Sequence, residues 1–137
     1  MGYRADIVNP GGGPLTATAD EAITAGYALK LVAVTGTETY RLGIADTAAS
    51  DIIVGIAVED AAAAEDVFAW QPIGIVCRGV AGDTVTLGAA LTCESGGRLI
   101  ATTTVGDYAI GLALEASTDG NDFSFLVGGH FRYAATS

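Results

Sequence analysis

The sequence is short of basic residues and of histidine, and each shortage excludes a class of function. Six lysines and arginines stand against 16 aspartates and glutamates, so the formal net charge is −10. A chain this acidic is repelled by nucleic acid and by anionic membrane surfaces, and we expect neither as a partner. The one histidine, His130, cannot form a two-histidine metal site, and no Gly-x-Ser-x-Gly elbow presents a serine. We therefore expect no enzymatic activity, no metal and no cofactor.

Long apolar runs and cysteine motifs are also missing. No run reaches the roughly 20 residues of a membrane helix, and the N-terminus lacks the charged-then-apolar pattern of a signal peptide. The spacing of Cys77 and Cys93 fits neither a zinc ribbon nor a CxxC redox motif. Two buried free thiols are the favoured interpretation, and a disulfide across neighbouring strands stays open.

The residues that are abundant favour a small β protein. Half of the 137 residues are apolar, which suits one domain with a real core. The 19 glycines, together with many alanines and threonines, favour short strands joined by tight turns. Gly-rich turns at 95–97 and 119–121 supply the positive φ that hairpins require. Short strands are predicted over residues 29–34, 39–44, 52–58, 68–76, 84–87, 90–93, 98–101, 108–114, 123–127 and 130–133.

An internal repeat organises these strands. Gly55-Ile-Ala-Val-Glu59 matches Gly111-Leu-Ala-Leu-Glu115, and seven residues past each Glu stand Asp66 and Asp122. Upstream, Ala25–Leu29 resembles Leu87–Leu91. The repeat predicts two similar β-units, at approximately 25–76 and 87–133, packed into one sandwich or barrel.

The stretch 59–66, Glu-Asp-Ala-Ala-Ala-Ala-Glu-Asp, is the one segment with high helix propensity. Its counterpart in the second copy, Ala-Ser-Thr-Asp-Gly-Asn, is a turn. The repeat therefore favours a loop over residues 59–66, and a short helix remains the alternative.

The first 14 residues differ from the single β domain that we expect over 15–137. Their Pro-Gly-Gly-Gly-Pro stretch cannot form a regular helix or a central strand, because proline lacks a donor and glycine is costly to order. They are interpreted as a flexible N-terminal arm ordered by a partner, with a disordered tail as the alternative. The arm residues expected to contact that partner are Tyr3, Arg4, Asp6, Ile7, Val8, Asn9, Pro10 and Pro14.

Aromatic and acidic residues supply the remaining candidates. Phe68 and Trp70 fall on one strand face close to Pro72, which marks an edge or bulge. Core packing is the default for both aromatic side chains, and a subunit contact through these three residues is the alternative. Glu59 and Glu115 are the one tempting carboxylate pair, but strand ends meeting solvent explain them better.

Four motifs, in this order, resemble the capsid decoration (cement) proteins of tailed phages and archaeal viruses. They are Ala25-Gly-Tyr-Ala-Leu29, Gly55-Ile-Ala-Val-Glu-Asp-Ala-Ala-Ala-Ala-Glu65, Arg78-Gly-Val-Ala-Gly82 and Gly111-Leu-Ala-Leu-Glu115, and the match covers about residues 20–128. Ala64 stands where a glycine is common before the Glu, which leaves the type of that turn open.

The resemblance implies an all-β, compact β-sandwich or β-barrel (β-tulip-like) with an extended N-terminal arm. It also implies a homotrimer, made in the host cytoplasm, that binds the major capsid protein on the outer surface of the mature, expanded capsid. There it would stabilise the shell by bridging neighbouring capsomers. Another virion β-module, from a tail, fibre or baseplate, and a carbohydrate-binding module are the alternatives.

Overall fold

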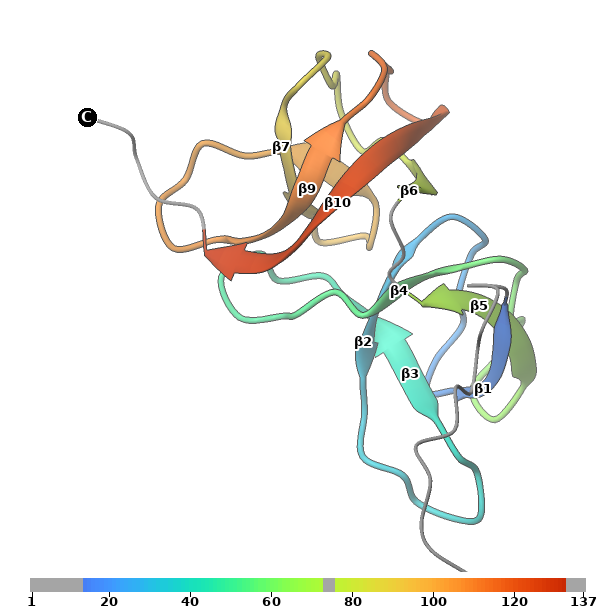
Figure 1. Cartoon of the computed structure of the whole chain (residues 1–137). Helices are drawn as coiled ribbons and strands as arrows, with labels where there is room; N and C mark the ends of the chain where they lie inside the picture. Colours follow the sequence, from blue (N-terminus) through green and yellow to red (C-terminus); the bar gives the residue numbers. More distant parts are fainter. Residues whose placement is uncertain (1–13, 73–75, 133–137) are drawn as a thin grey trace, which may run out of the picture.

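The computed structural model describes residues 14–72 and 76–132, and the side chains of all of these except 128–132. Within that part of the chain there are ten strands and no helix, so the all-β fold that the sequence predicts is confirmed. The strands divide into two stacked units, one made by the first five strands and one by the last five (Figure 1). No helix of the described residues is long and apolar enough to cross a membrane.

The first unit is a closed five-stranded barrel. Its strands are β1 (Leu15–Ala19), β2 (Ala28–Leu31), β3 (Arg41–Ile44), β4 (Gly55–Ala57) and β5 (Val67–Pro72). They pair in the order β1–β3–β2–β4–β5, and β5 closes the barrel on β1. All of these pairings are antiparallel except that of β1 with β3, which is parallel.

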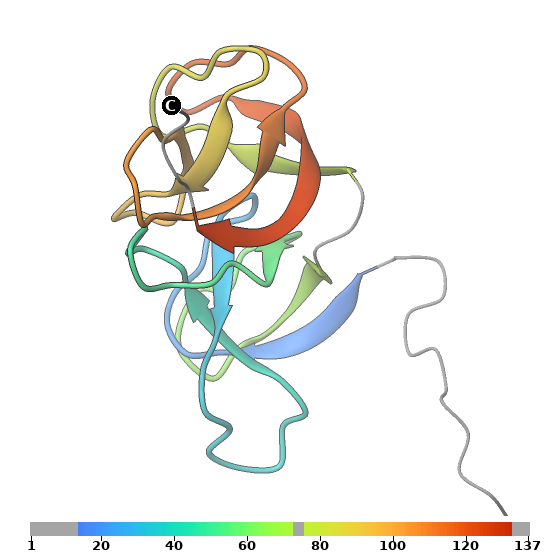
Figure 2. The same cartoon turned by 60° about the vertical axis from the view of Figure 1, so that its left-hand side comes forward.

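The second unit is a five-stranded antiparallel sheet. Its strands are β6 (Val76–Val80), β7 (Ala90–Cys93), β8 (Leu99–Ala101), β9 (Tyr108–Ala113) and β10 (Asp122–Arg132), in the order β6–β10–β9–β7–β8. The long strand β10 shifts register between Val127 and Phe131, as a β-bulge does. It curves across the unit above the first barrel (Figure 2).

The two units share one pairing scheme. β2 lies between β3 and β4 as β7 lies between β8 and β9, and β5 pairs with β4 and β1 as β10 pairs with β9 and β6. Outside the strands, the antiparallel bridge Ile23–Ala61 has its counterpart in Val85–Ser117. The parallel β1–β3 pairing is reduced in the second unit to one parallel bridge between the chain just after β6 and β8. Both units are therefore versions of one five-stranded design.

The backbone corrects the repeat by one residue in the loop before the last strand of each unit. The Ala19 N–H donates to the Asp66 carbonyl at 2.8 Å, and the Ala81 N–H donates to the Asn121 carbonyl at 2.9 Å. Asp66 therefore corresponds to Asn121, not to Asp122 as the sequence comparison had it. The second loop is one residue shorter, which a motif of small residues does not reveal.

Both copies of the Gly-x-Ala motif begin with a glycine because the neighbouring strand leaves no room for a side chain. A Cβ at Gly111 would overlap the carbonyl oxygen of Leu126 and lie 2.9 Å from its carbonyl carbon. At Gly55 it would lie 2.6 Å from Cε3 of Trp70 and would also overlap the backbone of β5. Tight packing of β4 on β5, and of β9 on β10, depends on these two glycines.

Each unit has its own apolar core, dominated by two side chains of its last strand. Phe68 and Trp70 fill the first barrel, and Phe123 and Phe125 fill the second unit. The two phenylalanine rings of β10 lie 6.1 Å apart, and the Trp70 ring meets Tyr40 edge-on at 5.7 Å. Core packing, the default interpretation of these aromatic pairs, is what the structure shows.

The first unit also contributes residues to the core of the second. Ala28 and Ile56, on the outer side of the barrel, are 0% and 3% exposed and belong to the second unit's apolar cluster. Three backbone hydrogen bonds cross the junction, from the Ala28 N–H to the Gly97 carbonyl (2.7 Å), from the Val80 N–H to the Gly26 carbonyl (3.1 Å) and from the Tyr108 N–H to the Ala48 carbonyl (2.7 Å). The two units therefore pack on each other through the outer side of β2 and β4.

Three further sequence predictions have a definite outcome. Residues 59–66 form a loop, not a helix, and Ala61 in that loop pairs with Ile23. Cys77 and Cys93 are both buried free thiols. The Gly-rich turns are confirmed, with φ of 90° at Gly97 and 84° at Gly120.

The predicted strand over 52–58, buried on both faces, is wrong at its ends. Only Gly55–Ala57 is strand, and Ile52 and Val58 are 43% and 48% exposed. Asp51 Oδ2 accepts two backbone N–H groups of the preceding segment and ties it into a turn. That turn delays the start of the strand, which the apolar run does not indicate.

Candidate functional site

Catalytic or metal-binding chemistry would need reactive side chains gathered in one place. Among the described residues, no three His, Cys, Asp or Glu side chains are grouped to hold a metal ion. Burial raises the pKa of the Cys93 thiol to about 11, so this sulfur is protonated and unreactive at neutral pH. The remaining candidates for a site are the ion pairs and the surface.

The largest charged cluster surrounds Arg41 at the start of β3. Its side chain is only 6% exposed and donates from Nε to Asp20 at 2.9 Å and from Nη1 to Glu38 at 3.4 Å. It also forms a two-pronged pair with Glu65, from Nη1 and Nη2. The hydrogen bond from Arg41 lowers the pKa of the Glu65 carboxyl, and the same bond raises the pKa of the guanidinium. The cluster ties the loop at 59–66 to β3.

Glu65 lies in the turn whose type the departure at Ala64 left open. It adopts φ 75°, the left-handed region, and it is the one described non-glycine residue that does so. Its counterpart by backbone hydrogen bonding is Gly120, with φ 84°. In the first unit, the ion pair with Arg41 stabilises a backbone conformation that the second unit reaches with glycine.

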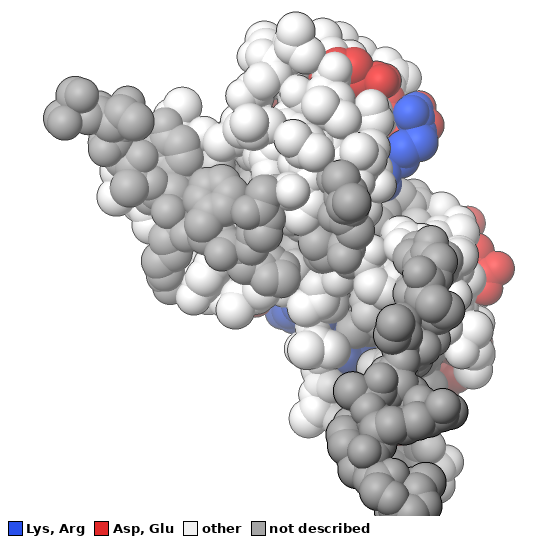
Figure 3. Space-filling model, in the orientation of Figure 1, with Lys and Arg blue, Asp and Glu red and all other residues white. Residues whose placement is uncertain are grey.

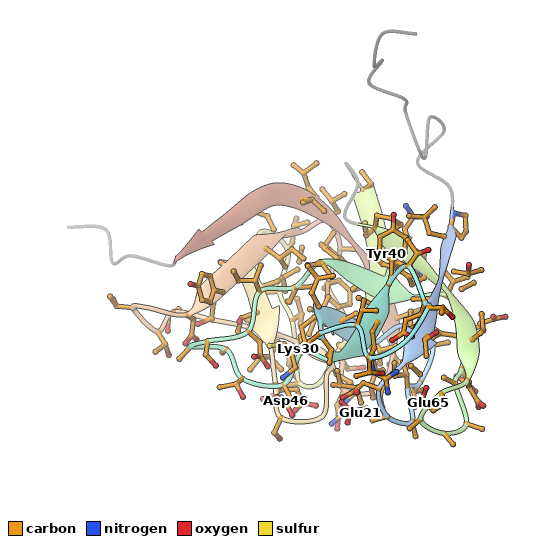
Figure 4. All side chains as sticks on the ribbon, turned by 90° about the horizontal axis from the view of Figure 1, so that it is seen from below. Glu21, Lys30, Tyr40, Asp46 and Glu65 are labelled. Atoms are coloured by element: carbon orange, nitrogen blue, oxygen red, sulfur yellow. The ribbon has the colours of Figure 1, made fainter. Side chains whose placement is uncertain are left out.

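The other basic side chains that the structure describes are also engaged in ion pairs. Lys30 lies 3.2 Å from Asp51 Oδ2 and points toward Asp46 (Figure 4). Arg98 bonds Glu94 and Asp119, each at 2.8 Å, across the turn and loop of the second unit. The remaining pair, Arg78 with Asp122 at 2.9 Å, joins β6 to β10. The described surface therefore offers no cluster of unpaired cations for a polyanion.

The tempting carboxylate pair is not a pair. Glu59 Oε1 accepts the Ala69 N–H at 2.8 Å, and Glu115 Oε2 accepts the Ser124 hydroxyl at 2.9 Å. Each carboxylate thus binds within the last strand of its own unit, at equivalent places in the repeat. Their geometry explains why both motifs end in Glu without invoking a shared substrate.

Of the predicted arm and subunit-contact residues, the structure places four. The arm residues Tyr3 to Pro10 lie outside the described residues, and Pro14 is exposed just before β1. Phe68 is fully buried and Trp70 is 5% exposed, so both side chains are occupied inside the first barrel. Of the proposed subunit-contact residues, only Pro72 is partly exposed, at the end of β5.

A surface feature that the sequence reasoning missed lies on the second unit. Val76, Leu126, Leu112 and Ala90 are successive Cα partners across β6, β10, β9 and β7, and we call them the outer row. Val76, Leu126 and Leu112 are 54%, 38% and 44% exposed. The sequence does contain a signal for this surface. Leu112 lies in a strand that is apolar on both faces, whereas a strand of an antiparallel sheet with one solvated face needs apolar residues on one face only.

The outer row consists of uncharged residues in a strongly acidic chain. Where the structure describes it, the face toward the viewer in Figure 3 is mainly uncharged, and acidic side chains gather at the right-hand edge of both units. Pairing directly across strands brings the outer-row side chains into one continuous apolar strip. A strip of exposed aliphatic side chains is typical of a contact surface, not of a catalytic centre.

Fold and surface together define an all-β, two-unit protein whose described basic side chains form ion pairs and whose exposed apolar side chains include a row across the second unit. Comparison with known proteins gives this class a family. The model of the phage cement protein family matches residues 8–129, which is most of the chain and includes both units. The chain therefore belongs to the phage cement protein family, as the resemblance of its sequence motifs indicated.

A solved structure and a search of curated proteins complete the comparison. The head fiber gp8.5 N base of bacteriophage phi29, known from a crystal structure, superposes with a TM-score of 0.70. The superposition covers 84% of this chain and 92% of that one at 18% sequence identity, so it shows a shared fold. No curated protein matches the sequence. The protein is a structural component associated with the phage capsid.

Proposed function

We propose that the protein binds the exterior of the mature, expanded capsid as a homotrimer and stabilises the shell by bridging neighbouring capsomers. The observation that carries the proposal is the family match over residues 8–129, because it spans both units and is not confined to one motif. An acidic chain whose described cations are all paired suits an outer position, away from the packaged DNA.

The stabilisation is thermodynamic. A protein that binds the expanded shell and not its precursor lowers the free energy of the expanded state by its differential affinity. Packaged DNA pushes the capsomers apart, and a ligand that contacts two of them must be released before they separate. A trimer engages three such sites, so weak contacts combine through their high effective concentration.

The partner on the shell is the major capsid protein, reached in this proposal by the arm of residues 1–14. The arm joins the folded part directly at β1, since Pro14 is exposed and Leu15 already pairs with Trp70. Within the barrel, β1 is bonded on both sides, to β3 and β5. An arm that continues from this anchored strand transmits a load to the barrel core, and strand addition to an open sheet edge of the capsid protein satisfies its exposed backbone groups.

The proposal is tested by mixing the purified full chain with expanded heads that lack it and, separately, with precursor heads. We expect saturable binding to expanded heads alone, density on the outer surface between capsomers by electron microscopy, and a higher temperature of DNA release. Density on the tail, or equal binding to precursor heads, would overturn it.

The arm has its own test, deletion of residues 1–14. Since the first unit is held from Leu15 onward, we expect a folded protein with an unchanged circular dichroism spectrum and at least a tenfold loss of affinity for expanded heads. A matched control replaces exposed Thr37 and Thr39 by Ala in the loop between β2 and β3, and should bind as the parent does. Undiminished binding by the truncated chain would refute the role of the arm.

A further inference from the structure

The outer row of the second unit has a counterpart in the first unit. In register, β2 pairs Ala28 with Ile56 on β4, and β7 pairs Ala90 with Leu112 on β9. These positions are equivalent because the glycine of each motif, one residue earlier on β4 or β9, pairs with the leucine that follows on β2 or β7. The same apolar pair therefore stands on the outer side of both units.

The fate of the pair differs between the units. Ala28 and Ile56 are buried because the second unit packs on them, whereas Leu112 is 44% exposed and Ala90 is partly exposed. In the first unit, the outer side of the β2–β4 pair therefore forms the interface with the second unit. The second unit carries the same surface with no partner among the described residues of its own chain.

The turn that leads into each pair shows the same difference. Gly26 has φ 88°, and a Cβ there would lie 2.5 Å from Cγ2 of Val80 in the other unit. Gly88 has φ 82°, and a Cβ there would meet no described atom within 4 Å. The turn before β2 is covered by the second unit, and the equivalent turn before β7 is open.

The charge of the chain limits where two copies can meet. Each copy carries −10, so copies repel unless they approach through a surface that lacks acidic groups. The outer row contains no charged residue. On β6 and β10, two of the strands that carry the row, the Asp122 carboxylate is neutralised by Arg78. An approach through the outer row therefore brings no charged side chain of the row itself against a second copy.

We propose that a second copy of this chain packs on the outer row, which becomes the apolar centre of the contact between subunits. The proposal rests on the homo-oligomer of the proposed function and assigns its surface. The row on one copy meets a different surface of the next, as its counterpart does within the chain. Such a head-to-tail contact closes into a ring under three-fold symmetry. A stable contact buries about 800 Å² per partner, so polar residues around the row complete it.

The test is the mass of the purified full chain in solution, without capsids, by sedimentation equilibrium. We expect the parent chain to exceed the 13.7 kDa of one copy and to approach three times that mass. Leu112→Glu places a carboxylate in the middle of the row and should weaken association at least a hundredfold, leaving single copies at micromolar concentration. Leu31→Glu is the matched control, because Leu31 is also an exposed strand leucine (64%) but lies on the first unit.

The proposal would be overturned by a parent chain that is a single copy, by a Leu112→Glu variant that keeps the parent's mass, or by equal dissociation of Leu31→Glu. If circular dichroism shows that Leu112→Glu is unfolded, the double variant Leu112→Thr, Leu126→Thr replaces it, since threonine keeps β-propensity and adds no charge. Its unchanged mass would also overturn the proposal. Because no capsid is present in this experiment, a negative result does not bear on capsid binding. Conversely, failure of the protein to bind heads does not bear on the mass measured in solution.

Discussion

Gly111→Ala should destabilise the protein strongly, although it adds a single methyl group. The new Cβ would overlap the Leu126 carbonyl oxygen and lie 2.9 Å from the carbonyl carbon and 3.0 Å from Cα of Val127. All three atoms belong to the backbone of β10, so no side-chain rotation relieves the overlap. β9 and β10 must move apart along the pairing that holds Phe125 opposite Ala113.

The magnitude follows from what such a shift disturbs. Inserting a methyl group into a packed region costs about 1–3 kcal/mol when side chains can adjust. Here a rigid strand must shift, which also weakens ladder hydrogen bonds of about 1 kcal/mol each. We expect a loss of about 3 kcal/mol in the free energy of unfolding. In a chain of this length, that corresponds to a drop of roughly 10 °C in Tm.

Urea unfolding followed by circular dichroism measures the effect, with Gly36→Ala as the control. Gly36 lies in an exposed loop, and a Cβ there would meet only the flexible carboxylate of Glu38 at 3.0 Å. The control should stay within about 0.5 kcal/mol of the parent, as surface substitutions usually do. A Gly111→Ala variant as stable as the control would refute the close approach of β9 and β10. Gly55→Ala, against the Trp70 ring, should fall at least as far.

Two pH dependences follow from the buried and paired groups. Burial raises the pKa of Cys93 from 9.0 to about 11, so the unfolded state loses its proton first, and the free energy of unfolding should fall as pH rises through that window. A Cys93→Ala variant that keeps the same decline would contradict the assignment. The pKa of Glu65 is lowered by Arg41, so its contribution is present above about pH 4.5 and is lost in acid. Arg41→Met should be destabilised at pH 7 and should regain stability relative to the parent on acidification, measured by urea titrations at pH 7 and pH 3.5.

Much of the fold could be predicted from the sequence because local rules decide it. Glycine at positions 97 and 120 indicated turns, and both residues do adopt the positive φ that favours glycine. The duplicated motif around Gly55 and Gly111 indicated two similar units. Both glycines are needed for the same reason, because the neighbouring strand leaves no room for a Cβ. Because residues 59–66 have a turn as their counterpart, the repeat outweighed helix propensity and correctly predicted a loop there.

Other features could not be predicted because they depend on pairing between distant strands. The beginning of each unit at β1 and β6 carries no shared motif, so the repeat seemed to start some ten residues later. Phe68 and Trp70 share a face, but only the closure of the barrel by β5 on β1 decides that this face points inward. Likewise, alternation shows that Leu112 and Ile56 lie on the outer side of their strands, but not which of them is covered.

The comparison of the two units separates what the fold requires from what it leaves free. Gly55 and Gly111 are both required, because either backbone clashes with any larger residue. Ile56 must be apolar, because it is sealed between the units. Within one copy, nothing requires Leu112 to be apolar, because its side chain is exposed. A polar residue would fit at such a strand position and would make the protein more soluble. An aliphatic side chain at the place where the first unit forms its interface is therefore best explained by burial against another molecule, and the proposed homo-oligomer would supply that molecule.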